Sequence, residues 1–184
     1  MLKKLTITFA LFSLLILSGC SSIAKYGNEE PAAIVNGEVI TVYDLRLLFP
    51  DEKALSYLDG AIQMELAKQE VEKMGLDISK HLEEEEDWFS ILPPEDADDE
   101  NTKQIRDFAK SQAKKLNMTP EEFQRAYAKK LNEQNAYLLT YLEKKLGPYE
   151  YDSETGTADY NEKANRLLEE LAEQHKDEIE VLIN

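Results

Sequence analysis

The sequence predicts a mostly α-helical domain with a small β-sheet, which is formed by an N-terminal hairpin and a C-terminal strand. Asn36 and Gly37 stand between two short apolar runs, which is typical of a tight hairpin. Apolar residues at helical spacing, divided by helix caps, then occupy most of the chain between residues 41 and 174. The last residues alternate between aliphatic and acidic side chains, which is the period of a strand.

The first segment is typical of an export signal. A basic start precedes an apolar run over residues 5–18, which is too short to span a membrane and leads into the motif LSGC ending at Cys20. This motif resembles the lipobox of bacterial lipoproteins, which implies that residues 1–19 are a signal peptide and that Cys20 carries diacylglycerol and an N-acyl chain such as palmitate. The alternative is a secretory signal followed by a chance cysteine, but Cys20 is the only cysteine in the chain. We therefore expect a lipoprotein anchored to the cell membrane on the extracytoplasmic side.

The composition restricts the possible partners. The chain has 184 residues, with 21 Lys and Arg against 37 Asp and Glu, and a formal net charge of −16. This charge argues against binding to nucleic acid or to anionic lipid head groups. Attachment to the membrane is therefore assigned to the acyl chains, because each buried methylene contributes about 0.8 kcal/mol. Once Cys20 is acylated, no thiol is left for a disulfide, a redox centre or a nucleophile.

A tether and a hairpin are expected next along the chain. Residues 20–31 are polar and have little periodicity, which is typical of a tether that lifts a domain off the bilayer. Folded sequence is expected over residues 32–184. Its hairpin should turn at Asn36 and Gly37, because both central residues of such a turn need a positive φ.

Two helices are predicted after the hairpin. Thr41 is expected to cap a short helix together with Asp44, and Pro50 ends it. A second helix is expected over residues 52–74, where apolar residues recur at helical spacing, with Gly75 as its C-cap.

The middle of the chain is expected to be less regular. A third short helix is predicted to start near Ser79, and a turn or acidic loop covers residues 92–100. Helix resumes over about residues 101–115. The short helix would carry Leu82, Trp88 and Phe89.

A long helix follows. Residues 119–122 (TPEE) give a clear helix start, with Thr119 as N-cap and Glu122 closing the capping box. Gly147 and the proline after it are expected to stop the helix. Its buried stripe is predicted to consist of Phe123, Tyr127, Leu131, Leu138, Leu142 and Leu146.

The C-terminal part predicts how the domain closes. A polar connector over residues 149–159 precedes a last helix over about 160–174, and residues 178–183 have a strand period. A two-stranded hairpin alone is marginally stable in water. We therefore expect the C-terminal segment to pair with residues 33–35.

Four segments resemble the chaperone domain of SurA-like and PrsA-like extracytoplasmic foldases. They are the hairpin (IVNGEVIT, residues 34–41), the end of the second helix (LAKQEVEKMGLDI, 66–78), the start of the long helix (LNMTPEEF, 116–123) and the last strand (EIEV, 178–181). The resemblance implies a multi-helix fold like the SurA N-terminal domain, over residues 32–184, and chaperone-like binding of exported or unfolded proteins.

One departure from that family bears on function. In the foldases, a parvulin-type prolyl isomerase domain lies between the long helix and the final helix. Here this gap spans only residues 147–159, which is too short for a domain. His81 and His175 are the only histidines, and neither lies in a pattern like the parvulin active site. The chaperone scaffold is therefore expected without the isomerase.

The sequence has little that indicates catalysis or cofactor binding. It lacks the common nucleophile, metalloprotease, P-loop and dinucleotide motifs, so we expect no catalytic residues, no cofactor, no bound metal and no small-molecule substrate. The acidic runs at residues 83–87 and 95–100 could attract calcium. Solvated charge is the better interpretation, because Asn101 stands where an EF-hand loop needs glycine.

An apolar run lies between the two acidic runs. Residues 88–92 (WFSIL) could form an exposed patch for a client or partner, or a local core that pins the following proline pair. The local core is the favoured alternative. The residues proposed as a possible apolar client surface are Trp88, Phe89, Phe123, Tyr127 and Leu131.

The leading hypothesis is a non-catalytic, membrane-anchored lipoprotein that holds exported or unfolded proteins in an apolar cleft between its helices. The alternative is an envelope adaptor lipoprotein that binds one specific protein partner in a membrane assembly. An enzyme of unrecognised type is the third hypothesis, and no group of residues supports it.

Overall fold

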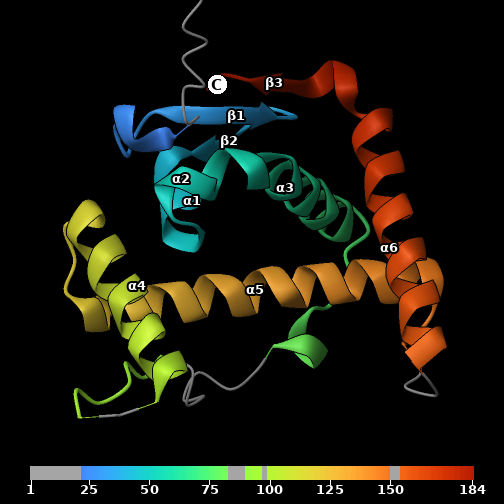
Figure 1. Cartoon of the computed structure of the whole chain (residues 1–184). Helices are drawn as coiled ribbons and strands as arrows, with labels where there is room; N and C mark the ends of the chain where they lie inside the picture. The colour runs from blue at the N-terminus through green and yellow to red at the C-terminus, as the bar shows by residue number, and fades with distance from the viewer. Residues whose placement is uncertain (1–21, 83–89, 97–98, 150–153) are drawn as a thin grey trace, which may run out of the picture.

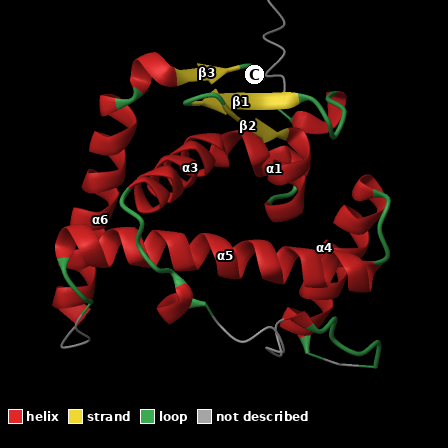
Figure 2. Ribbon diagram, turned by 180° about the vertical axis from the view of Figure 1, so that it is seen from behind, coloured by secondary structure: helices red, strands yellow, loops and turns green. Residues whose placement is uncertain are grey.

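The computed structural model describes residues 22–82, 90–96, 99–149 and 154–184, and most of these residues are helical. A three-stranded antiparallel sheet lies at one end, next to the C-terminus (Figures 1 and 2). The expected class, a mostly α-helical protein with a small sheet, is therefore confirmed.

The hairpin forms where the sequence predicts it. Strand β1 (Pro31–Val35) and strand β2 (Glu38–Thr41) pair antiparallel across a two-residue turn. Asn36 and Gly37 both have a positive φ, 50° and 86°, which is the conformation of a type I′ turn. Glycine is needed at the second position because other residues are strained there.

The C-terminal strand completes the sheet as predicted. Strand β3 (Ile179–Val181) pairs antiparallel with β1, so the strand order is β2-β1-β3. The Leu182 amide extends the ladder by donating to the carbonyl of Ala32 at 2.9 Å. Of the alternating apolar residues, Ile183 is buried, whereas Val181, on this edge strand, is 52% exposed.

The helices after the hairpin begin as predicted but are divided differently. Helix α1 (Val42–Leu48) has the expected capping box between Thr41 and Asp44. The single helix expected over residues 52–74 is wrong. It is divided into α2 (Asp51–Ala54), the 3-10 turn η2 (Leu55–Tyr57) and α3 (Leu58–Lys73). At the break, the Ser56 hydroxyl donates to the Lys53 carbonyl, and the Tyr57 ring stacks on Phe49 at 4.4 Å.

Gly75 ends α3 as predicted. Its φ is 63°, its amide donates to the carbonyl of Glu72, and the amide of Leu76 donates to the carbonyl of Val71. These two hydrogen bonds form a Schellman motif, which requires a left-handed residue at this position.

The remaining helices form a frame around α3. After the turn η3 (Ser79–His81), helix α4 (Glu100–Leu116) leads into the long helix α5 (Pro120–Leu146), which has the predicted capping box at Thr119 and ends at Gly147. The predicted connector was too long, because α6 (Glu154–Gln174) begins earlier. Tyr149 packs on Tyr160 and hydrogen-bonds to Thr157, which adds contacts to this first part of α6. The turn η5 (Lys176–Glu178) then leads to β3.

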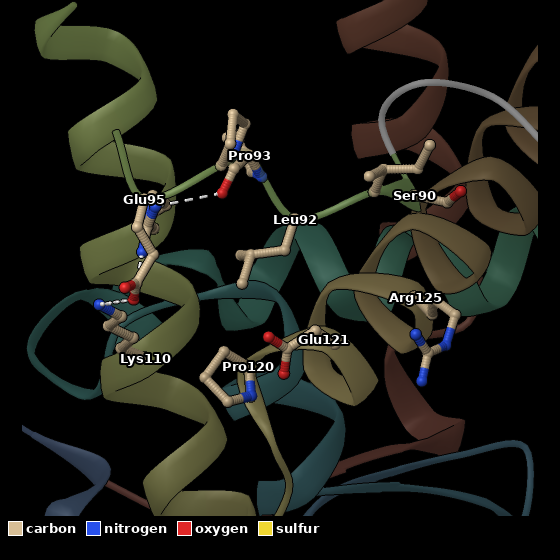
Figure 3. Close-up of a pocket in the computed structure, with 11 residues that line it drawn as sticks. Ser90, Leu92, Pro93, Glu95, Lys110, Pro120, Glu121 and Arg125 are labelled. Carbon is tan, nitrogen blue, oxygen red and sulfur yellow. Dashed lines mark hydrogen bonds and ion pairs between the residues drawn. The ribbon is translucent and has the colours of Figure 1, made fainter. Parts of the chain in front are cut away.

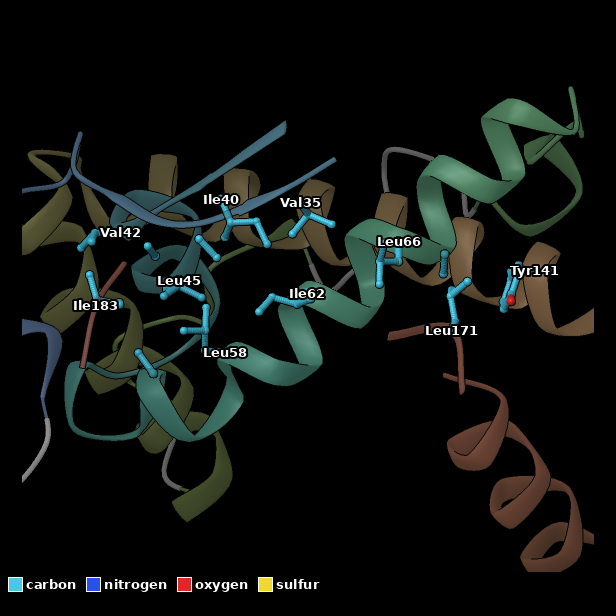
Figure 4. Close-up of a cluster of buried hydrophobic side chains, with 14 of the residues drawn as sticks. Val35, Ile40, Val42, Leu45, Leu58, Ile62, Leu66, Tyr141, Leu171 and Ile183 are labelled. Carbon is cyan, nitrogen blue, oxygen red and sulfur yellow. The ribbon is translucent and has the colours of Figure 1, made fainter. Parts of the chain in front are cut away.

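Two apolar clusters hold the fold. The larger one, here called the sheet-end core, lies between the sheet, α3, the second half of α5 and α6 (Figure 4). It contains residues from both ends of the described chain, Ile23 and Ile183. The smaller one, here called the corner core, lies where α4 meets α5 and consists of Leu47, Ala109, Ala113, Leu116 and Phe123.

The expected tether is folded from residue 22 onwards. The turn η1 (Ile23–Lys25) places the Ile23 side chain in the sheet-end core, where it is fully buried. Three main-chain and side-chain oxygens of residues 23–28 accept hydrogen bonds from Arg46. This part of the prediction is corrected because the polar segment carries Ile23, which lies in the core, and Tyr26, which packs against it. Among the described residues, no helix combines the length and the apolar character needed to cross a membrane.

Candidate functional site

A groove of about 440 Å³ lies between the loop at residues 90–95, the middle of α4 and the start of α5 (Figure 3). It is referred to below as the groove. Its walls combine an apolar surface with charged groups of both signs. The apolar residues are Ile91, Leu92, Pro93, Pro94 and Pro120, and the charged residues are Arg106, Lys110, Arg125, Glu95 and Glu121.

Arg106 holds the loop that forms one wall of the groove. Its side chain is almost fully buried, and it donates hydrogen bonds to the carbonyl of Pro93 at 3.3 Å and to Glu95 Oε1 at 2.7 Å. Lys110 Nζ, one turn further along α4, donates to the same carboxylate oxygen at 3.4 Å. The hydrogen bond from Lys110 and the charges of both cations lower the pKa of Glu95. The loop is therefore fixed to α4 by a charged group that remains ionised at neutral pH.

The proline pair suits this loop. Pro93 and Pro94 have no backbone N–H. The loop before α4 therefore has fewer amide donors that need a hydrogen-bond partner. Leu92, beside them, points toward the start of α5 and packs against the corner core (Figure 3). Ile91, in contrast, is 66% exposed and is the most exposed large apolar side chain in the described part of the chain.

The described part of the apolar run at residues 88–92 therefore contains both a local core residue and an exposed residue. Leu92 acts as local core, as favoured from the sequence, and Ile91 is exposed, as expected of a binding patch. Trp88 and Phe89 lie outside the described residues.

The aromatic residues proposed on α5 lie beneath the groove rather than on its surface. Phe123 is fully buried and packs edge-to-face on Phe108 at 5.6 Å. Tyr127 is partly buried, stacks on Phe123 at 5.9 Å and has its pKa raised by desolvation. Leu131 is partly buried and belongs to neither core cluster. The inclusion of Phe123 in an exposed client surface is corrected, because its stripe faces α4.

The sequence-based site missed the exposed parts of the groove. Ile91 was recognised only as part of a run, and Pro120 only as a helix start. The spacing of Arg106 and Lys110 could have indicated this part of the groove. The two cations stand one turn apart on a helix that follows a proline pair and an acid. Their shared partner, Glu95, depends on how the loop folds back, which periodicity does not predict.

The two histidines lie apart, each beside a different glutamate. His81 Nε2 lies 2.8 Å from Glu143 Oε2, and His175 Nδ1 lies 2.7 Å from Glu178 Oε2. Hydrogen bonds from Lys80 and then His81 lower the pKa of Glu143. Both histidines connect neighbouring segments of the fold in these pairs.

The acidic runs are only partly described. Asp99 accepts a hydrogen bond from the Thr102 amide at 2.9 Å and so caps α4. Two acids of the run at residues 95–100 therefore have structural roles: Asp99 caps α4, and Glu95 pairs with Arg106. Within the described ranges, no three His, Cys, Asp or Glu side chains gather in a way that could hold a metal ion. Residues 83–87, 97–98 and Cys20 lie outside those ranges.

No protein-family model matches the chain, and neither the curated proteins nor the solved structures contain a significant match.

Proposed function

We propose that this protein is a non-catalytic lipoprotein, anchored through lipid on Cys20, that holds apolar segments of exported or unfolded proteins in the groove. The observation that carries the proposal is the exposed Ile91 on an apolar wall that Arg106 fixes in place. An exposed apolar wall with a charged rim is typical of a protein-binding surface. The LSGC motif and the apolar run before it support the anchor.

The composition of the groove favours extended segments over small molecules. Three cations and two carboxylates line it, and Arg106 and Lys110 both pair with Glu95, so a bound segment would meet a wall of low net charge on a chain of net charge −16. The high overall charge would keep a loaded complex soluble through repulsion between particles.

The test is suppression of aggregation by the purified mature chain. A chemically denatured test protein is diluted into buffer, and light scattering is recorded at increasing ratios of lipoprotein to client. We expect suppression in proportion to the lipoprotein concentration, with no effect of nucleotide and little effect of salt, because the contact is apolar. The variant Ile91→Ser should suppress severalfold less.

The matched control is Val39→Ser. Val39 is 51% exposed and lies on β2, at the other end of the molecule, so its replacement removes a similar exposed aliphatic side chain without touching the groove. Absence of suppression at severalfold molar excess of the parent protein would reject the chaperone proposal. The envelope adaptor that binds one native partner would then take its place.

The anchor is tested separately in cells. Cys20→Ala removes the only thiol in the chain, so labelled fatty acid should no longer be incorporated and the protein should leave the membrane fraction. Undiminished labelling of this variant would reject the lipid attachment.

A further inference from the structure

The residues directly behind Cys20 are part of the folded domain. Ser22 caps η1 through its hydroxyl, which accepts from the Ala24 amide at 3.2 Å. Ile23 is fully buried, and the Tyr26 amide closes the turn by donating to the Ile23 carbonyl. The chain is therefore fixed within three residues of the cysteine.

A buried arginine locks this segment. Arg46 Nη2 donates to the carbonyls of Ile23 at 2.9 Å and Tyr26 at 3.0 Å, and Nη1 donates to Asn28 Oδ1 at 2.6 Å. Its charge is paired with Asp51, whose nearest carboxylate oxygen lies 3.2 Å from Nη2. Both side chains are buried, so release of the segment would leave Nη1 of the guanidinium without its described partner in the interior, while Nε and Nη2 would keep Asp51.

The C-terminus is attached to the same segment. The Tyr26 hydroxyl accepts a hydrogen bond from the Asn184 amide at 3.2 Å and lies 3.3 Å from the Asn184 carbonyl oxygen, to which it can donate. The backbone hydrogen bond lowers the pKa of Tyr26. Ile183 is buried in the same core as Ile23, while its neighbours Val181 and Leu182 are 52% and 40% exposed. Two exposed aliphatic side chains thus lie beside the point where the chain leaves toward Cys20.

The groove lies at the other end of the molecule. Asn28 Nδ2 contacts the carbonyl of Lys115, near the C-terminal end of α4, at 3.1 Å. Arg106, which lines the groove, stands nine residues earlier on that helix, or about 13 Å along its axis. Figures 1 and 2 show the sheet and the loop that precedes α4 at opposite ends in both views.

We propose that the end formed by η1, β3 and residues 182–184 lies against the membrane, with Val181 and Leu182 in contact with the lipid head-group region and the groove facing away. This inference rests on the proposed lipidation of Cys20. Only two residue steps separate Cys20 from Ser22, which even in extended form span about 7 Å. The acyl chains, which insert in the bilayer, therefore hold this end of the domain at its surface.

The charge of this end limits how deep the contact reaches. Glu180, which directly precedes Val181 and Leu182, is also exposed. A carboxylate resists transfer into hydrocarbon, so the contact is confined to the head groups, and zwitterionic lipids suit it better than anionic ones.

The test measures which end touches the bilayer. The mature chain carries an environment-sensitive fluorescent amino acid at position 182 or, as the matched control, at position 91. It is coupled through the Cys20 thiol to a maleimide phospholipid in phosphatidylcholine vesicles that contain head-group nitroxide lipid. This coupling tests orientation whether or not cells acylate Cys20, so its failure is distinct from failure of the labelling experiment above.

Quenching at position 182 should exceed quenching at position 91 severalfold. A flexible ten-residue Gly-Ser insertion between Cys20 and Ser22 should reduce the quenching at 182 severalfold, because the domain can then turn away from the bilayer. Equal quenching at the two positions would overturn the proposed orientation. Quenching at 182 that is unchanged by the insertion would overturn the short link as its cause.

Discussion

The two cores of this protein are built from different kinds of contact. The sheet-end core joins Ile23 and Ile183, from opposite ends of the described chain, and lies beside the buried Arg46–Asp51 ion pair. The corner core is made mainly by two successive helices, with the Phe108, Phe123 and Tyr127 rings in contact. Only the corner core lies directly under the groove. One end of the molecule therefore closes the fold, while the other presents a surface above a more local core.

The largest expected effect is at the sheet end. Deletion of residues 178–184 removes β3, the buried Ile183 and the bonds between Asn184 and Tyr26. It also exposes an edge of β1. We expect a loss of several kcal/mol from a total of roughly 5–15 kcal/mol, measured by urea unfolding. A truncated protein with the parent midpoint would contradict the role of the C-terminus in closing the fold.

The next largest effect is expected for Arg46→Met. Among the described residues, this change leaves Asp51 with the Lys115 ammonium at 3.1 Å as its ion-pair partner. It also removes the Arg46 donor from the carbonyl of Tyr26 and leaves the carbonyl of Ile23 with the Tyr26 amide. Removal of one partner from a buried ion pair typically costs about 3–5 kcal/mol.

The double variant Arg46→Met, Asp51→Leu is the control for this prediction. It removes both charges and should recover part of the lost free energy of unfolding. If the single variant unfolds at the parent urea concentration, the ion pair does not fix the N-terminal segment.

A smaller effect is expected in the corner core. Phe123→Leu keeps an apolar side chain but removes the ring contacts with Phe108 and Tyr127, which should cost about 1 kcal/mol in the free energy of unfolding. Aggregation suppression should change little, because Phe123 is buried and does not line the groove. A large loss of suppression with little change in stability would mean that this ring contacts clients.

The smallest effect concerns pH. Hydrogen bonds from Thr102 lower the pKa of Asp99, and those from Thr119 lower the pKa of Glu122, each at the start of a corner helix. A carboxyl whose pKa is lower in the folded state stabilises the protein above its unfolded pKa. That contribution is lost as the pH falls through the folded pKa, below about pH 4 for Asp and Glu.

The urea midpoint should therefore fall on acidification through this range. In Asp99→Asn the fall should be shallower, because asparagine still caps the helix but does not titrate. An identical pH profile for the variant and the parent would show that Asp99 does not contribute to it.

Local signals in the sequence predicted much of the fold. Thr41, Thr119, Gly37 and Gly75 each determine the geometry of a cap or turn through their own chemistry, and each lies where it was expected. The pairing of β3 with β1 was also predictable, because a hairpin alone cannot shield its apolar face. These features depend on a few neighbouring residues or on one simple requirement for burial.

The errors occur where distant contacts decide the outcome. The break at Leu55–Tyr57 is stabilised by the stacking of Tyr57 on Phe49, and the segment that carries Ile23 into the core is held by Arg46 through the carbonyls of Ile23 and Tyr26. In the same way, Arg106 and Glu95 build the groove across a loop whose course has no periodicity. Such side-chain contacts between separate segments are not encoded in the spacing of apolar residues.

The most direct test of the proposed division between the two ends uses a photo-crosslinking amino acid at position 91 or at position 182. The full mature chain is coupled to phosphatidylcholine vesicles through Cys20, mixed with a denatured test protein and illuminated. This division of roles between the two ends predicts adducts with the client at position 91 and adducts with lipid at position 182. Client adducts at position 182 and none at position 91 would contradict it.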